Sequence, residues 1–176
     1  NITLINDGCH GLGSKISDNR KYAIKYADFV TYSFHPVKPI TTGEGGAVIT
    51  NNKKIDYLIK SLRTHGIVKN EKKFLWHNDM KFLGFNYRMT DIQCALGISQ
   101  LSKINVFVNE RNKIAKNYDK VFEKNPNVKI PEIQKNCKSS YHLYPLRINF
   151  KKLNIKKNLF FRKLLKKGIK LQVHYV

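Results

Sequence analysis

Lys38 is the residue of this chain best placed for covalent chemistry. It lies between Pro36 and Pro39, in a segment that starts where the apolar run 29–34 ends and stops where the run 47–50 begins. The prolines fix φ and push the preceding residues towards extended geometry. A lysine amine becomes a nucleophile when burial or nearby charge lowers its pKa, so a stiff loop of this kind suits Schiff-base chemistry. An ordinary loop lysine is the alternative that the spacing alone leaves open.

Enzymes that use pyridoxal phosphate need a carboxylate against the pyridine nitrogen, and hydroxyl and N–H groups for the phosphate, in addition to the lysine. Asp7 stands at the end of the apolar run 4–6 and supplies such a carboxylate. Ser33 offers a hydroxyl five residues before Lys38. Pyridoxal phosphate is therefore the cofactor that these residues suggest, although their spacing by itself does not require it.

The sequence motifs around these residues strengthen that hypothesis. The segment Ser-Phe-His-Pro-Val-Lys at 33–38, followed by Thr-Thr-Gly-Glu-Gly-Gly at 41–46, resembles the lysine loop of the DegT-type sugar-nucleotide aminotransferases, which are fold type I pyridoxal phosphate enzymes. Residues 5–14 resemble the family's strand-end motif, with Asn6 where an acidic residue is usual. Further similar blocks follow in family order at 85–96, 141–145 and 172–175. Within the family, these motifs most resemble those of the transaminases of the pseudaminic acid pathway.

The resemblance implies a role for each matching residue. Lys38 would be the Schiff-base lysine and proton shuttle, and Asp7 would pair with the pyridine nitrogen. His10 would lie near that aspartate and the ring, and Ser33 would bind the phosphate. Asn86 would reach the phosphate of the neighbouring subunit, which implies a homodimer.

Purely structural roles remain as alternatives for several of these positions. Asp7 could be a strand-end cap, His10 a hydrogen-bonded loop residue, and Asn86 a turn residue. Arg88 and His174 are weaker suggestions for the substrate side, and no residue suggests a metal ligand. His35 is interpreted as part of the loop structure.

The function implied by the resemblance is transfer of an amino group, from glutamate, to a nucleotide-linked 4-keto-6-deoxy sugar in the cytoplasm. Sugar dehydratases of the same family carry histidine in place of the lysine, so Lys38 argues against them. A non-catalytic remnant of the family is a further alternative. So is a basic module that binds nucleic acid.

Positive charge is the strongest feature of the composition. The formal net charge is +21 over 176 residues, and residues 151–170 hold nine basic side chains and no acidic ones. Such a field attracts polyanions, but the lysines are scattered and no RNA-binding or zinc-finger motif accompanies them. We therefore expect a solvated lysine-rich surface, with neither a specific nucleic acid nor a membrane as partner.

Cysteine usage and hydropathy agree with a cytoplasmic enzyme. The three cysteines lack the spacing of a disulfide framework or a zinc site. No apolar run approaches the roughly 20 residues of a membrane-spanning helix.

The expected fold is α/β: part of a fold type I large domain over residues 1–125, then part of a small α/β domain over 126–176. Both ends look cut, so we expect a fragment that is inactive alone. Continuous apolar runs predict a sheet covered on both faces, and residues 67–81 are expected to form a long loop. A capping box at Thr90 and Gln93 predicts a helix start. Strands are predicted at 3–5, 29–34, 47–50, 128–130, 142–148 and 171–175. Helices are predicted at 23–26, from 51 or 52 to 66, at 90–121 (as one helix or two) and at 158–167.

Overall fold

The computed structural model describes residues 2–69 and 74–174. Contacts within the chain define two compact units. The first unit comprises Asn1–Lys113 and Ile133–Leu143, and the second comprises Ile114–Glu132 and Tyr144–Val176. The predicted division after residue 125 concerns the domains of a longer enzyme and stays a prediction.

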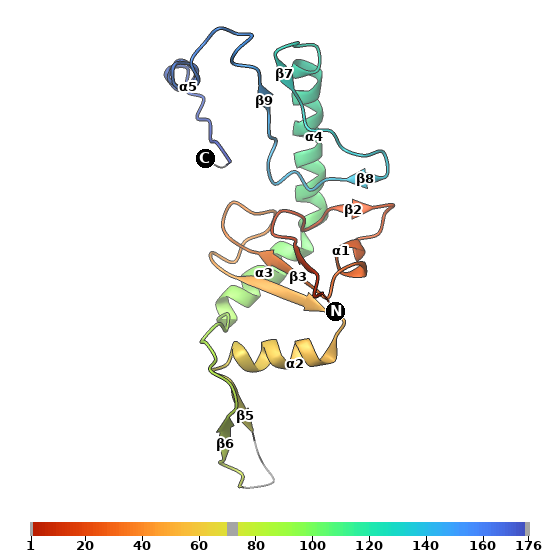
Figure 1. Cartoon of the computed structure of the whole chain (residues 1–176), viewed down its shortest axis with the longest axis vertical. Helices are drawn as coiled ribbons and strands as arrows, with labels where there is room; N and C mark the ends of the chain where they lie inside the picture. The colour runs from red at the N-terminus through yellow and green to blue at the C-terminus, as the bar shows by residue number, and fades with distance from the viewer. Residues whose placement is uncertain (1, 70–73, 175–176) are drawn as a thin grey trace. The chain divides into compact units, whose positions relative to one another are not determined.

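A three-stranded mixed sheet in the order β1-β3-β4 forms the first unit's centre (Figure 1). β1 pairs with β3 in parallel, and β3 pairs with β4 antiparallel. The fold is therefore α/β with a mixed sheet, as the sequence predicted, although the first strand lies two residues later than expected. The strands are β1 (Ile5–Asp7), β3 (Phe29–Ser33) and β4 (Gly46–Thr50).

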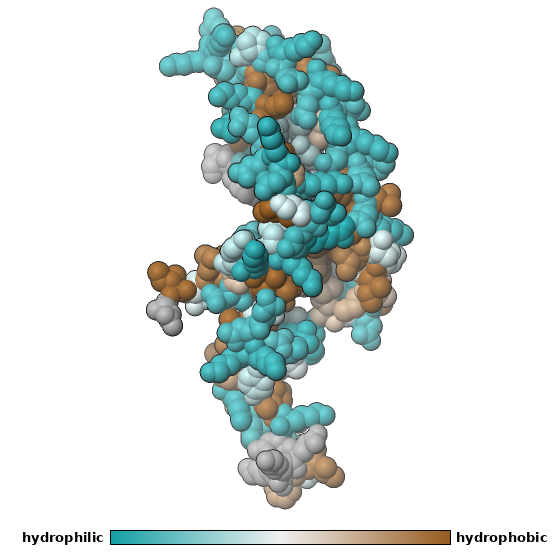
Figure 2. Space-filling model, turned by 90° about the vertical axis from the view of Figure 1, so that its right-hand side faces the viewer, coloured by the Kyte–Doolittle hydropathy of each residue, from teal (hydrophilic) through white to brown (hydrophobic). Residues whose placement is uncertain are grey.

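This sheet is not covered on both faces in the chain described here, which corrects the prediction. Val30 at its centre is fully buried, but Ile5, Val48 and Ile49 are exposed. Among the described helices of the first unit, α1 (Tyr22–Lys25) and α2 (Lys53–Leu62) make the main contacts with its strands. Apolar side chains therefore form patches between the hydrophilic ones on the surface in Figure 2.

The longer helices begin where their capping residues predict. The Asn52 side chain accepts hydrogen bonds from the N–H groups of Lys54 and Ile55 at the start of α2. The Thr90–Gln93 capping box opens α3 (Asp91–Ser102), which confirms that prediction. The following helical pattern forms a separate helix, α4 (Ile104–Phe122), after a break at Lys103.

A hairpin replaces the long loop predicted for residues 67–81. β5 (Ile67–Lys69) and β6 (Asn78–Met80) pair antiparallel, and the hairpin extends from the end of α2, away from the three-stranded sheet (Figure 1). Residues 70–73 of the predicted loop lie outside the described residues. Each strand has only three residues, which are Ile67, Val68 and Lys69 in β5 and Asn78, Asp79 and Met80 in β6. Runs this short do not mark a strand in the sequence.

A second short pairing was also missed. β2 (Lys15–Ile16) pairs antiparallel with β8 (Cys137–Lys138), where the sequence analysis predicted no strand. This pairing ties residues 133–143 to the N-terminal part of the first unit.

Strand content in the second unit is smaller than predicted. β7 (Val128–Lys129) pairs antiparallel with β9 (Arg147–Ile148), so the strand predicted at 142–148 shrinks to two residues. Residues 171–174 form no strand, and Tyr175 lies outside the described residues. The helix predicted at 158–167 is present as α5 (Lys157–Lys166).

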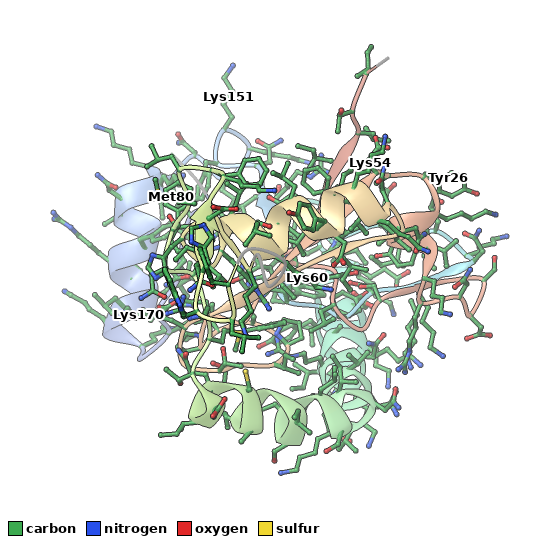
Figure 3. The ribbon with its side chains drawn as sticks, turned by 90° about the horizontal axis from the view of Figure 1, so that it is seen from below. Tyr26, Lys54, Lys60, Met80, Lys151 and Lys170 are labelled. Atoms are coloured by element: carbon green, nitrogen blue, oxygen red, sulfur yellow. The ribbon has the colours of Figure 1, made fainter. Side chains whose placement is uncertain are left out.

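All nine basic side chains between residues 151 and 170 are exposed. Lys151, for example, extends away from the ribbon in Figure 3. Within the described part of the chain, no helix has the length and apolar character needed to cross a bilayer.

Ile40 anchors the Lys38 loop in the core of the first unit. Its side chain is buried in a cluster with Ile104 and Val108 of α4, and Leu12 and Phe34 pack against this cluster. Because Ile40 follows Lys38 by two residues, the core fixes one side of the loop.

We predict that Ile40→Ala lowers the free energy of unfolding by about 2–5 kcal/mol, because it removes buried methyl groups and leaves a cavity. Ile40→Val should cost only about 0.5–1.5 kcal/mol. Urea unfolding followed by circular dichroism measures both variants. Equal effects of the two substitutions would show that Ile40 is not part of a tightly packed core.

Candidate active site

The loop that carries Lys38 is closed at its neck by backbone hydrogen bonds. The N–H of Phe34 donates to the Gly45 carbonyl at 2.9 Å, and the N–H of Thr42 donates to the Phe34 carbonyl at 3.0 Å. The Thr41 hydroxyl donates to the same Phe34 carbonyl at 3.1 Å. The loop therefore leaves and re-enters the β3–β4 ladder at fixed points.

Inside the loop, Lys38 ends a tight turn. Its N–H donates to the His35 carbonyl at 2.9 Å, with Pro36 and Val37 as the central residues. Proline is favoured at the first central position because its φ is already set. Lys38 is half-buried and Pro39 is buried, so the turn holds the backbone of the lysine against the protein.

Glycine is required where the loop rejoins the sheet. A Cβ on Gly46 would lie 2.6 Å from the Tyr32 carbonyl oxygen, which is a backbone atom held in the β3–β4 ladder. Gly45 has a φ of 151°, and a Cβ there would lie 2.5 Å from the Thr42 hydroxyl oxygen. These two close approaches explain the paired glycines of the motif.

Asp7 lies at the end of β1, next to β3. The register pairs it with Thr31, and its Oδ1 accepts a hydrogen bond from the Cys9 N–H at 3.1 Å. Hydrogen bonds from the Cys9 side chain and backbone hold the pKa of Asp7 below its ordinary value, and the positive charges of His10 and Lys38 contribute. The carboxylate therefore remains ionised near neutral pH and faces solvent.

His142 is a member of this cluster to which the sequence analysis gave no role. Its ring centroid lies 4.3 Å from that of His10, at an interplanar angle of 54°. Burial lowers the pKa of His142 to about 4, with contributions from the charges of His10, Lys38 and Arg111. The signal in the sequence was the similar block at 141–145, but nothing in that block indicates that it meets the loop after β1.

The remaining predicted residues lie at different places. Ser33 ends β3, and its Oγ accepts a hydrogen bond from the His35 N–H at 3.4 Å, so it belongs to the Lys38 loop. Asn86 forms an isolated β-bridge with Thr64, and its side chain is exposed. Arg88 is exposed on the same segment before α3. His174 belongs to the second unit, where it is exposed.

The residues around Lys38 fit pyridoxal phosphate. The cofactor has a pyridine nitrogen, a phosphate and an aldehyde, which call for a carboxylate, hydroxyl or N–H donors, and an amine. Asp7 provides an ionised carboxylate whose pKa responds to the charge of Lys38, so the carboxylate and the amine share one neighbourhood. Among the described residues, no cluster of three or more metal-ligating side chains offers a competing metal site.

Comparisons with known proteins point to one group. The sequence model of the DegT/DnrJ/EryC1/StrS aminotransferase family matches residues 1–176. A UDP-4-amino-4,6-dideoxy-N-acetyl-beta-L-altrosamine transaminase of Campylobacter jejuni is 49% identical over 175 residues, which cover 99% of this chain and 45% of that protein. The protein of the same name from Helicobacter pylori is 38% identical over 174 residues, again covering 45% of its length. The chain thus spans about half the length of these curated relatives.

Solved structures agree with the sequence comparisons. Helicobacter pylori PseC, an aminotransferase of pseudaminic acid biosynthesis, superposes with a TM-score of 0.88 at 36% identity. The match covers 99% of this chain and 46% of PseC. Spr1654 from Streptococcus pneumoniae, which is described as a sugar aminotransferase, superposes in its pyridoxamine phosphate form with a TM-score of 0.86 at 28% identity. This match covers 99% of this chain and 46% of Spr1654.

The contact between Asp7 and Cys9 leads to a prediction about thiol reactivity. Burial and then the Asp7 carboxylate raise the pKa of the Cys9 thiol, so at a given pH less of it is the reactive thiolate. We expect iodoacetamide to alkylate Cys9 more slowly than the exposed Cys94 at pH values around the ordinary thiol pKa of about 8.5.

Asp7→Asn should accelerate alkylation of Cys9 and leave that of Cys94 unchanged, because the substitution removes the negative charge that opposes the thiolate. Peptide mass spectrometry measures both sites in one sample, so Cys94 serves as the internal reference. An unchanged Cys9 rate in Asp7→Asn would contradict the contact.

Proposed function

Because the chain belongs to the DegT/DnrJ/EryC1/StrS aminotransferase family and has the α/β fold of its fold type I members, we propose that the protein is a pyridoxal phosphate-dependent sugar aminotransferase. Its acceptor substrate would be a nucleotide-linked 4-keto-6-deoxy sugar, and its amino donor glutamate. The 49% identity to the Campylobacter jejuni transaminase supports this substrate class. The observation that carries the proposal is Lys38, held in a closed loop within the electrostatic reach of Asp7.

Pyridoxal phosphate, when bound, supplies the electron sink that transamination requires. Asp7 would hold the pyridine nitrogen in its protonated form, since an ionised carboxylate favours a positive charge beside it. The positive neighbours His10 and Lys38 help to keep this carboxylate ionised. His10 would lie beside the ring.

Lys38 would move the proton of the reaction. Its amine would bind the cofactor. When released, the amine would carry a proton between the reacting carbon of the substrate and C4′ of the cofactor. The turn from His35 to Lys38 limits where the amine can reach, and positioning of this kind is a large part of catalysis.

Phosphate binding would involve two subunits. Ser33 would contribute its hydroxyl from the Lys38 loop, and Asn86 would contribute its amide to the site of a neighbouring copy. We therefore propose that the enzyme is a homodimer. Arg88 and His174 would lie on the substrate side, and the enzyme would act in the cytoplasm, where nucleotide sugars and free cysteines are found.

In the full-length parent enzyme, Lys38 should be the lysine that becomes labelled when the protein is reduced with borohydride in the presence of pyridoxal phosphate. Peptide mapping would find the pyridoxyl group there, because the proline-framed loop presents this amine beside Asp7. Lys38→Ala should abolish the label, whereas Lys54→Arg on the exposed side of α2 should leave it intact (Lys54 is labelled in Figure 3). A label on another lysine in the unmodified protein would refute the assignment and favour the alternative of a non-catalytic remnant.

In the full-length parent enzyme, replacement of Asp7 by asparagine should preserve the fold and reduce the amination rate by about 10²–10³-fold, the size of effect seen when one preorganised electrostatic group is removed. An amide cannot keep the pyridine nitrogen protonated by ion pairing. The rate is measured with glutamate and a UDP-linked 4-keto-6-deoxy hexosamine. Asp18→Asn is the matched control, because Asp18 is exposed and forms its ion pair with Lys15, away from Asp7 in the sequence. Near-normal turnover in Asp7→Asn would give Asp7 a different role.

A further inference from the structure

The His10 carbonyl is held by a buried hydroxyl from a distant part of the chain. Ser140 is fully buried, and its Oγ donates a hydrogen bond to the His10 carbonyl at 3.1 Å. Ser14 completes the contact, because its hydroxyl donates to the Ser140 Oγ at 3.1 Å and accepts from the Ser140 N–H at 3.0 Å. The Ser140 hydroxyl therefore makes one hydrogen bond as donor and one as acceptor, as is expected of a buried polar group.

His10 lies in a tight turn formed by residues 8–11. The Gly11 N–H donates to the Gly8 carbonyl at 2.8 Å, which closes the turn. The peptide group that joins His10 to Gly11 is therefore held at both ends. Its N–H is bonded within the turn, and its carbonyl is bonded to Ser140. While both hydrogen bonds are made, the ψ angle of His10 is fixed, and the torsions of its side chain are its main remaining freedom.

The same turn is tied to the carboxylate of Asp7. The Cys9 N–H, in the middle of the turn, donates to the Asp7 Oδ1 at 3.1 Å. Asp7 ends β1, and the Gly8 N–H donates to the Thr31 carbonyl of β3 at 2.9 Å. The sheet therefore fixes the start of the turn, whereas the end of the turn depends on Ser140.

Ser140 can serve as an anchor because α4 holds the backbone on both sides of it. The Asn112 amide donates to the Ser139 carbonyl at 2.9 Å, and the Arg111 guanidinium donates to the Tyr141 carbonyl at 3.0 Å. Tyr141 has a φ of 46°, which is uncommon for a residue with a Cβ and persists only where the surroundings impose it. A shift of this segment therefore cannot compensate for the loss of the Ser140 hydroxyl.

The segment that carries Ser140 also limits the ring of His10. His142 lies two residues further on, and its ring centroid is 4.3 Å from that of His10. One short segment thus contacts both the backbone and the side chain of His10. Such control is expected where the orientation of a group matters, because a displacement of about 1 Å can remove much of its catalytic effect.

We propose that Ser140 is a positioning residue of the active site, whose buried hydroxyl fixes the peptide group after His10 and thereby holds the His10 ring in place near Asp7. The proposal rests on the proposed function in one respect, which is that His10 is taken as a residue beside the cofactor ring. Because Ser140 is fully buried, it acts through the backbone of the turn and does not itself touch substrate or cofactor.

Amide hydrogen exchange in the cofactor-free, full-length parent enzyme is the first test. In the unsubstituted enzyme, the Gly11 amide should exchange more slowly than in an unstructured peptide, because its hydrogen bond must open first. In Ser140→Ala this amide should exchange about fivefold faster, the change in population expected from the loss of one hydrogen bond. The Gly66 amide, which donates to the Ser61 carbonyl in another turn, should keep its original rate.

Ser14→Ala is the matched variant, because it removes a hydroxyl from the same buried pair but leaves the bond to His10. It should lower the midpoint of thermal unfolding much as Ser140→Ala does, and it should leave the Gly11 exchange rate close to the original. Four outcomes would overturn the proposal: an unprotected Gly11 amide in the unsubstituted enzyme, an unchanged Gly11 rate in Ser140→Ala, an equal acceleration in both variants, or an equal acceleration at Gly66. The first of these does not depend on how a variant folds.

Turnover gives the second test, again in the parent enzyme. Ser140→Ala should lower the amination rate about fivefold. Ser102→Ala is the control and should leave the rate unchanged, since the Ser102 hydroxyl donates to the Ser99 carbonyl within α3. In a His10→Ala background, Ser140→Ala should have no further effect, because two changes that act through one residue are not additive. The same loss of rate in both backgrounds would show a purely structural role and contradict positioning through His10.

Failure of the proposed function would look different. The unsubstituted parent enzyme would then show no amination, and Lys38 would escape the borohydride label, while the exchange pattern at Gly11 stayed as expected. Failure of the positioning role would leave amination and the label intact, and Gly11 would be insensitive to Ser140→Ala.

Discussion

The backbone hydrogen bonds at Phe34 are the constraint on which the candidate site depends. Phe34 directly follows β3, and both its N–H and its carbonyl are bonded to the far side of the Lys38 loop. The loop can therefore be neither widened nor shifted without breaking these hydrogen bonds. Burial of Ile40 adds a second fixed point on the other side of Lys38. A lysine between two such anchors has little freedom except in its own side chain.

One set of positive charges has opposite effects on the two kinds of titratable group in the site. Asp7 loses affinity for its proton chiefly through the Cys9 hydrogen bonds, and His10 and Lys38 add to this effect. His142 loses affinity for a proton chiefly through burial, and the same two residues again add to it. The carboxylate is thus kept charged and the imidazole is kept neutral. A pyridoxal phosphate site can use both states, since it needs a fixed negative charge at the ring and no surplus positive charge next to its lysine.

The sequence predicted those parts of the site that are local. Residues within a short stretch define each of three features: the Lys38 loop, the end of β1 at Asp7 and the Thr90 cap. Local propensities and sequence motifs are therefore enough to predict them. His142 was missed because its place depends on Ser140 meeting Ser14 and His10, a contact between distant segments that no local pattern encodes.

The β5–β6 hairpin was missed for a different reason. Three-residue strands are too short to show the alternation by which a strand is recognised, and they form here because a partner strand lies alongside. The predicted coverage of the central sheet fails in the same way, because burial depends on which elements pack against a strand. Strand composition at Val48 and Ile49 fits a covered sheet, but the elements of the first unit leave these side chains exposed.

The surroundings of Asn86 bear on the proposed dimer. Leu83, Phe85 and Tyr87 are all exposed on the segment that holds this asparagine, and the rings of Phe85 and Tyr87 stack with their centroids 4.8 Å apart. Exposed apolar side chains gathered in one place are typical of an interaction surface. An asparagine within such a surface is well placed to enter the site of another copy, whereas a simple turn residue would need no apolar neighbours. The exposure of these apolar side chains therefore favours the role that the family resemblance implies for Asn86.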